Sequence, residues 1–182
     1  MAFDANDSTS IPENDGSINI SQALGDGVKG VILAVIDPVK TTGENDSRQA
    51  YEDSNLVVMI EVTGVAGSPT IRKPKDQGPS PVKVGDKGLL WFRYQRSTAG
   101  GEPEKYLAPF TSALAKILRE NGLTAPRVGD TLTIVHNKFG DKDPKYPMRQ
   151  PAKLADCKYE KASGGGFSSA DGGGQTITAD DL

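Results

Sequence analysis

The sequence has few of the side chains on which metal sites and most catalytic centres depend. Its 182 residues include one cysteine, one histidine and one tryptophan. A single cysteine excludes an internal disulfide, and one Cys with one His cannot build a thiolate–imidazole zinc site. No stretch approaches 18 consecutive apolar residues, which excludes a transmembrane helix. The start, MAFDANDSTS, lacks the basic and apolar regions of a secretory signal. We therefore expect a cytoplasmic protein without membrane contact.

Motifs for phosphate, dinucleotide or nucleophilic chemistry are also missing from the sequence. There is no GxGxxG and no glycine loop followed by Lys-Ser or Lys-Thr. His136 lies within a strand pattern, where a hydrogen-bonded or solvent-facing ring is expected rather than a catalyst. Cys157 is expected to be a small, semi-buried side chain. The loop acids Asp141, Asp143, Glu102 and Glu104 lie among Lys and Pro, so we interpret them as solvated charges. The sequence predicts no enzyme activity, no cofactor and no bound metal.

Charge is distributed unevenly along the chain. The formal net charge is −3, yet residues 1–27 carry −5 and residues 162–182 carry −3, neither with any Lys or Arg. All 21 basic residues lie in 28–161 beside 16 acidic residues, which leaves this body at +5. A basic body between acidic ends favours a polyanionic partner.

Composition divides the chain into three parts. Residues 1–24 are polar and are predicted to form a flexible acidic arm, in which Ile18 and Ile20 fit a small edge strand. Residues 25–161 are expected to form one folded domain. Residues 162–182 contain SGGGFSSADGGG and end in QTITADDL, which predicts a disordered glycine-rich tail with an acidic tip.

Five strand patterns and one helix pattern lie within the body. The strand patterns are rich in β-branched or aromatic residues and are bounded by Gly, Pro and Asp: Val28–Ile36, Leu56–Thr63, Gly88–Gln95, Thr131–Asn137 and Ala152–Glu160. Apolar residues at helical spacing from Phe110 to Leu118 predict one helix, with Pro109 at its start and Gly122 after its end.

The order of these elements is β-β-β-α-β-β. We therefore expect an all-β fold with one helix, in the form of a five-stranded oligonucleotide/oligosaccharide-binding (OB) barrel. A β-sandwich with one helix is the alternative. Two long connections, 65–87 and 138–151, are candidates for functional loops.

Binding a single strand without sequence choice requires cations along the phosphates and flat rings for the bases. Both are present in the second long connection. The cations there are Lys138, Lys142, Lys145 and Arg149, and the rings are Phe139 and Tyr146. The alternative for the two rings is that they pin the loop onto the barrel.

The third strand pattern offers a second platform. Alternation places Leu90, Phe92 and Tyr94 on one face and Trp91, Arg93 and Gln95 on the other. The Leu90/Phe92 face fills a core better, which leaves Trp91 and Arg93 outside as a stacking site; the alternative is a core tryptophan. Cations that could extend this track are Arg96, Arg72, Lys73 and Lys75.

Several stretches resemble the single-stranded-DNA-binding OB-fold proteins of bacteriophages that infect actinobacteria. They are LAPFTSALAKILRENGL, VGDTLTIVHNKFGD, the final KLADCKYEK with Tyr159 near its end, and the upstream KVGDKGLLWF. Bacterial single-strand binders usually end in acidic residues and a Pro-Phe tip, whereas this chain ends in Asp180, Asp181 and Leu182.

The resemblance implies a protein that coats single-stranded DNA during phage replication, recombination or repair. Its partners would be single-stranded DNA or RNA, further copies of itself, and replication or recombination proteins recruited by the tail. Acidic ends would suppress binding to other polyanions. The rival interpretations are a structural or protein-interaction module without nucleic-acid binding, and a Mg²⁺-dependent nuclease that uses the loop acids.

Overall fold

The computed structural model describes most of the body and part of the N-terminal arm. The described residues are 10–45, 47–72, 78–99, 101–105, 108–142, 144–145, 147–148 and 150–163. They form nine strands and one helix: β1 (Gly16–Asn19), β2 (Gly27–Glu44), β3 (Ala50–Ala66), β4 (Thr70–Arg72), β5 (Ser80–Pro81), β6 (Lys87–Thr98), β7 (Glu104–Lys105), α1 (Pro109–Glu120), β8 (Thr131–Phe139) and β9 (Lys153–Glu160). No helix in these ranges is long and apolar enough to cross a membrane.

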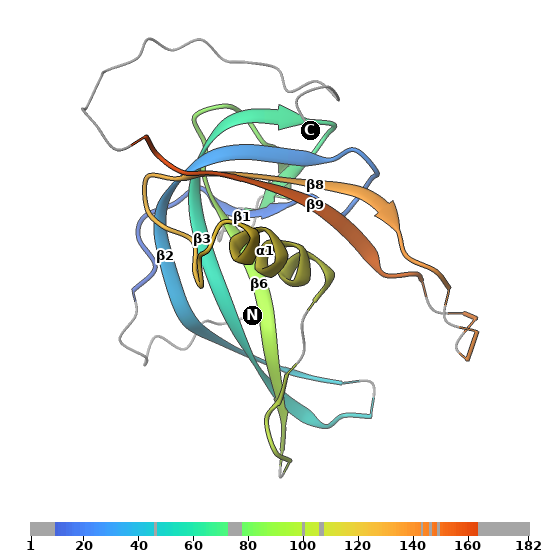
Figure 1. The fold of residues 1–182 in the computed structure, drawn as a ribbon. Helices are drawn as coiled ribbons and strands as arrows, with labels where there is room; N and C mark the ends of the chain where they lie inside the picture. The colour runs from blue at the N-terminus through green and yellow to red at the C-terminus, as the bar shows by residue number, and fades with distance from the viewer. Residues whose placement is uncertain are drawn as a thin grey trace.

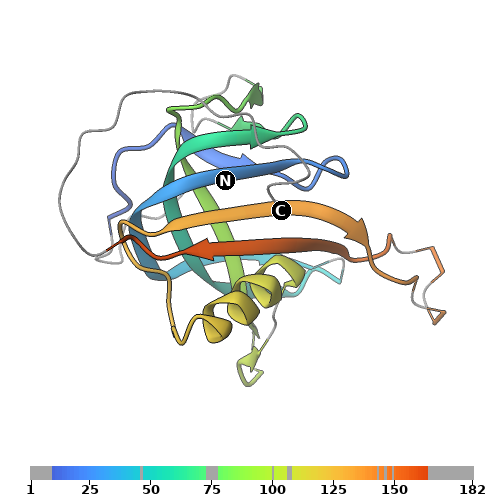
Figure 2. The ribbon, with the colours of Figure 1, turned by 45° about the horizontal axis from the view of Figure 1, so that its top comes forward.

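All the strands belong to one mixed sheet. The strand order is β5-β4-β1-β6-β3-β2-β8-β9, and β7 pairs separately with β6. Every pairing is antiparallel except that of β1 with β6, which is parallel. The sheet curves strongly, and α1 lies on its concave side between β6 and β9 (Figures 1 and 2). The expected class, mostly β with a single helix, is confirmed.

The concave side of the sheet contains the main core. Its members come from nearly every element, and include Ile32 of β2, Ile60 of β3, Phe92 of β6 and Leu132 of β8, all 1% exposed or less. The helix adds Leu114 and Leu118 from its apolar face. Beyond Glu120, the Gly122 N–H bonds the Arg119 carbonyl and the Leu123 N–H bonds the Leu118 carbonyl, which ends the helix in a Schellman motif.

Three equivalent turns lead into β2, β6 and β8. They are Ala23–Asp26, Lys83–Asp86 and Arg127–Asp130, each with an aliphatic residue and then a glycine between the ends. The glycine φ lies between +88° and +93°, a conformation that other residues rarely adopt. In each turn the glycine N–H and the aspartate carbonyl pair with both backbone groups of one residue on a neighbouring strand: His136, Val62 and Ile32 respectively. Two of these turns contain Val-Gly-Asp, and the third contains Leu24-Gly25-Asp26.

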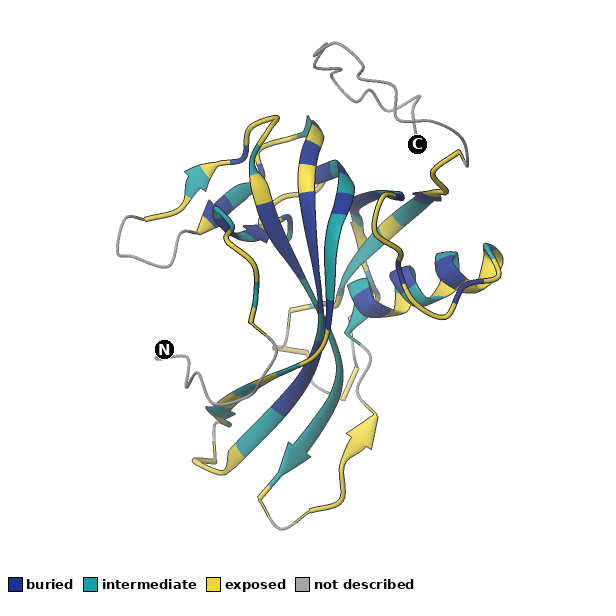
Figure 3. Cartoon of the chain, turned by 90° about the vertical axis from the view of Figure 1, so that its left-hand side faces the viewer, coloured by how far each residue is buried: buried dark blue, intermediate teal, exposed yellow. Residues whose placement is uncertain are grey.

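The strands are longer than predicted. Strand β2 was expected to end at Ile36, before Asp37-Pro38, but it continues to Glu44. The pairing with β3 shifts register between Ile36 and Val39, and this irregularity accommodates the proline within the strand. As a result, β2, β3 and β6 project beyond the core as an arm, which Figure 3 shows as a change from mainly buried to partly exposed residues.

The folded region also begins earlier than residue 25. Residues 16–19 form β1, and Ile18 and Ile20 are 8% and 3% exposed within the main core. The strand anticipated around these two isoleucines is therefore confirmed, but its expected edge position was wrong, because β1 pairs with both β4 and β6. Residues 1–9 and 164–182 lie outside the described part of the chain.

Candidate nucleic-acid interface

Strands β3 and β6 separate the predicted core face from the predicted binding face. Leu90 and Phe92 are 4% and 1% exposed in the main core, as expected. Trp91 lies opposite Val57, and Arg93 opposite Asn55, so these two side chains share the other, outer face. The predicted division of the third strand pattern is therefore confirmed from Leu90 to Arg93.

A β-bulge changes the alternation beyond Arg93. The register shifts between Ser54 and Asn55, so that Asp53 lies opposite Arg96. Residues three apart in a regular strand would point to opposite faces, and the extra residue brings Arg93 and Arg96 to the same face. Gln95 then lies opposite Ser54, so placing it beside Trp91 and Arg93 was wrong.

The two arginines converge on one buried carboxylate. Asp53 is 5% exposed. The Arg96 Nε atom is 2.7 Å from Asp53 Oδ1, and Arg96 Nη2 is 2.9 Å from Asp53 Oδ2. The Arg93 Nη1 atom lies 3.2 Å from the same Oδ2 atom. Burial by itself would raise the pKa of Asp53, but hydrogen bonds and charges from Arg96 and Arg93 outweigh it and hold the pKa below its ordinary value.

Tyr51 completes this cluster and was missed from the sequence. The Arg96 guanidinium lies over the Tyr51 ring, with its central carbon 3.9 Å from the ring centroid. The expected second strand began at Leu56, which left Tyr51, Asp53 and Asn55 in a loop. The sequence did contain a signal for this extension. The three residues are spaced two apart, as side chains on one face of a strand are, and they directly precede the apolar run. We call Tyr51, Asp53, Arg93 and Arg96 the arginine cluster.

Trp91 lies further along the same outer face. It is half-buried against a second, smaller apolar cluster formed by Ile36, Val57, Met59 and Leu89. Its indole Nε1 donates a hydrogen bond to Ser17 Oγ at 3.0 Å. A recess of about 260 Å³ also touches Trp91, but most of its lining, including Leu90, Phe92 and Ile134, belongs to the main core.

Arg72 extends this face toward the sheet edge. It lies opposite Ser17 in the pairing of β4 with β1, and its side chain is exposed. Opposite residues of neighbouring strands share a face, so Arg72 and Trp91 flank Ser17. On the other side of the arginine cluster, β7 places Glu104 opposite Arg96.

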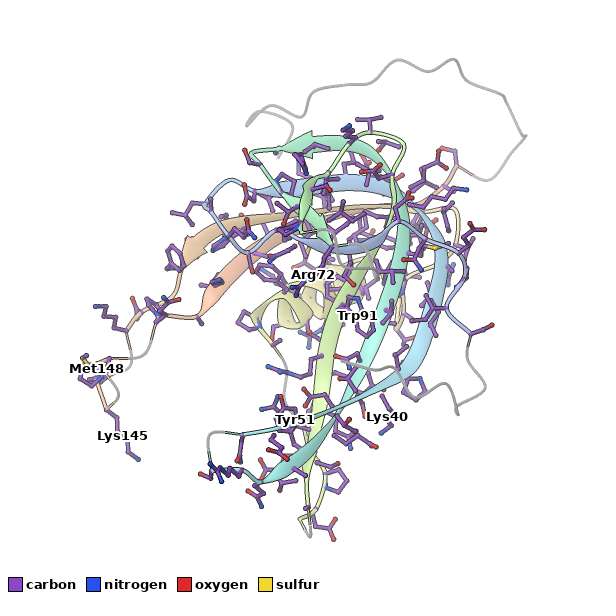
Figure 4. All side chains as sticks on the ribbon, turned by 180° about the vertical axis from the view of Figure 1, so that it is seen from behind. Lys40, Tyr51, Arg72, Trp91, Lys145 and Met148 are labelled. Atoms are coloured by element: carbon purple, nitrogen blue, oxygen red, sulfur yellow. The ribbon has the colours of Figure 1, made fainter. Side chains whose placement is uncertain are left out.

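The remaining predicted residues form a separate group on β8 and the connection to β9. Lys138 and Phe139 end β8, while Lys142 and Lys145 are exposed in the connection. Figure 4 shows Lys145 at the tip of a projection well away from Trp91. The expected single track of cations and rings is thus divided into two groups. Tyr146, Arg149, Lys73 and Lys75 lie outside the described residues.

The Phe139 ring has both an exposed and a packed side. It is 44% exposed, and it meets the His136 ring edge-on with centroids 5.1 Å apart. His136 itself is fully buried, so of the two expectations the hydrogen-bonded ring is the one the structure shows. Its Nδ1 lies 3.0 Å from the Ala23 carbonyl, which requires the proton on Nδ1, while Nε2 has no hydrogen-bond partner among the described residues.

Two other side chains of the predicted final strand, Cys157 and Tyr159, have pKa values that their surroundings raise. Cys157 is semi-buried as expected, and burial, with a smaller contribution from the Asp156 charge, raises its pKa to about 12. Burial and a hydrogen bond to Asp130 likewise raise the pKa of Tyr159 to about 12. Its hydroxyl donates to Asp130 Oδ2 at 2.7 Å and accepts from the Arg127 N–H at 2.8 Å. Both groups are therefore neutral at physiological pH.

Across the described ranges, no three His, Cys, Asp or Glu side chains come together as metal ligands. Comparison with known proteins finds no matching family model, no matching curated protein and no matching solved structure.

Proposed function

We propose that this protein binds single-stranded DNA without sequence choice, and that the outer face of β3 and β6 carries the binding. Non-specific single-strand binding combines cations along the backbone with rings on which bases stack. The outer face has both: Arg72, Arg93 and Arg96 supply cations, and Trp91 and Tyr51 supply rings. Asp53 contacts both Arg93 and Arg96, and Glu104 lies opposite Arg96 on the neighbouring strand.

The observation that carries the proposal is the arginine cluster next to a half-buried tryptophan on one face. Asp53 holds two guanidinium groups in place, so a phosphate group meets cations that are already ordered. The Arg96 plane stacked on Tyr51 offers a further flat surface for a base. Each stacked base contributes about 1–3 kcal/mol, so two rings would outweigh any single lysine.

The connectivity of the central strands supports an OB-type barrel as the underlying fold. The order β6-β3-β2-β8-β9 links the first three strands of the pattern as a meander and adds the last two beside the first. The helix follows the third strand and packs against both β6 and β9, the two edges that a closed barrel would join. Oligonucleotide binding on strands 2 and 3 of such a barrel is in keeping with the proposed face.

The biological role we propose is to coat exposed single strands during DNA replication, recombination or repair. The resemblance to phage single-strand binders is its support, together with the acidic ends that flank a basic body. Several copies would line one strand, and the tail would recruit other proteins of the same process.

The test is the affinity for a fluorescently labelled oligo-dT, measured by anisotropy at two salt concentrations. We expect salt-dependent binding, with a log–log slope of roughly −0.7 for each phosphate contacted. Tyr51→Ala is expected to weaken binding by about 5- to 100-fold, the equivalent of one stacked base, whereas Tyr51→Phe keeps the ring and is expected to bind normally.

Two control variants locate the site. Lys116→Ala removes an exposed cation from α1, a surface outside the proposed face, and should leave the affinity unchanged. Phe139→Ala tests the separate β8–β9 group. Binding that is lost with Phe139→Ala but kept with Tyr51→Ala would move the site to that group. No salt-dependent binding at all would favour a protein-interaction module, and Mg²⁺-dependent cleavage of the oligonucleotide would favour a nuclease.

A further inference from the structure

The N-terminal segment lies on the proposed binding face. Ile11 packs against the small outer cluster of Ile36, Val57, Met59 and Leu89, the same cluster against which Trp91 packs. This cluster is on the side of the sheet opposite the main core, because its members alternate with core residues along β3 and β6. Part of the outer face is therefore already occupied by the protein's own chain.

The attachment of this segment is strong at one end and weak at the other. Asp15 is fixed by two backbone contacts with Lys87: its N–H donates to the Lys87 carbonyl at 2.7 Å, and its Oδ2 accepts the Lys87 N–H at 2.8 Å. Residues from Gly16 onward then enter β1. Before Asp15, Ser10, Pro12 and Glu13 are exposed, and Ile11 is the apolar contact with the sheet.

The N-terminal segment is acidic, as expected of a segment that competes with nucleic acid for the same surface. Residues 1–15 contain Asp4, Asp7, Glu13 and Asp15 and no Lys or Arg. Ser17, just after the segment, accepts the hydrogen bond of the Trp91 indole. The segment therefore combines an apolar side chain on the outer cluster with acidic residues, which resemble the base and the phosphate of a nucleotide.

We infer that residues 10–14 act as an internal competitor, which a DNA strand must displace in order to stack on Trp91 and the outer apolar cluster. The inference rests on the proposed function, since it concerns the regulation of that same face. Displacement requires only that Ile11 leave the sheet, because Asp15 and β1 anchor the chain independently. The competitor lowers the apparent affinity by the fraction of molecules in which the face is covered.

The experiment compares oligo-dT binding by four variants with the full chain. A chain that begins at Glu13 lacks the competitor, and Ile11→Ala removes only its apolar contact. Leu24→Ala is the matched control, because it shortens an aliphatic side chain that is 53% exposed on a turn. Asp4→Asn with Asp7→Asn removes charge alone. We expect the truncation and Ile11→Ala to tighten binding at least about threefold, as follows when the covered form predominates, and Leu24→Ala to change nothing.

Trp91 provides a second measurement, since it is the one tryptophan in the sequence. Its fluorescence should be quenched more readily by acrylamide in the truncated chain and in Ile11→Ala, and oligo-dT should restore protection. The inference is overturned if neither variant changes affinity or quenching, or if the charge variant alone tightens binding. Such results would leave the proposed function intact as long as the full chain still binds and Tyr51→Ala weakens it. Absence of binding by every variant would instead contradict the proposed function.

Discussion

Strands β2, β3 and β6 have different surroundings at their two ends. Between Val57 and Ile60, β3 is covered on both faces, by the main core on one side and by the smaller cluster with Ile11 on the other. Between Tyr51 and Asn55, β3 still pairs with β2 and β6, but its side chains are polar and form the arginine cluster and a Lys40–Glu52–Ser54 contact. The pairing of β3 with its neighbours therefore continues along the strand, whereas the surroundings of its side chains change from apolar to charged.

This difference indicates a division of roles along one sheet, with one part for stability and the other for binding. The apolar part of these strands stabilises the fold, since burial of apolar area is the largest favourable contribution to the free energy of folding. The polar length is held in a strand conformation by its neighbours and presents charged and aromatic groups at fixed spacing. A rigid element that carries polar groups loses little conformational entropy on binding a ligand.

The sharpest test of this division compares two phenylalanines. Phe92→Ala is expected to lower the free energy of unfolding by about 3–5 kcal/mol, because the ring is 1% exposed within the main core. Phe139→Ala is expected to lower the free energy of unfolding far less, because the Phe139 side chain is 44% exposed. Urea unfolding followed by circular dichroism measures both. Equal losses would mean that the end of β8 is as much a part of the core as β6.

An intermediate effect is expected for the carboxylate of the arginine cluster. Asp53→Asn should lower the free energy of unfolding by about 1–3 kcal/mol at pH 7, because two arginines lose a buried charged partner. The folded-state pKa of Asp53 is lowered, so its contribution is complete above the unfolded-state value of about 3.9 and is lost as the pH falls further.

The measurement is unfolding of both proteins between pH 7 and pH 3. The difference in stability between wild type and Asp53→Asn should be constant down to about pH 4 and shrink below it. A difference that stays constant to pH 3 would contradict the assignment of Asp53 as the ionised partner.

The smallest effect is expected on the opposite face of the projecting arm. Lys40 Nζ lies 3.0 Å from Glu52 Oε1 and 2.7 Å from Ser54 Oγ, and the Lys40 and Glu52 side chains are 37% and 45% exposed. Because solvent screens such pairs, Lys40→Ala should change the free energy of unfolding by at most about 1 kcal/mol. A loss as large as that of Asp53→Asn would show that the arm depends on both of its faces, against the proposed division.

Local patterns were sufficient for the five central strands and the helix. Runs such as LVVMIEVT, rich in β-branched residues and followed by glycine, favour a buried strand, and the spacing from Phe110 to Leu118 matches one helical face. The candidate site was anticipated in part. Trp91 and Arg93 were assigned to the correct face, because alternation is a local property. Tyr51 and the grouping of Arg93 with Arg96 were missed, because a bulge depends on the partner strand.

The sequence by itself determined which segments form the central strands and the helix, because apolar periodicity and left-handed glycines act over a few residues. It also determined that cations are concentrated in the body of the chain. Only the tertiary structure decided how far the strands extend past Pro38 and Leu56, because polar residues become strand when neighbouring strands supply their hydrogen bonds. The tertiary structure also brought Asp53 between two arginines and laid Ile11 over the outer face, since these contacts join residues about 25 to 80 positions apart in the chain.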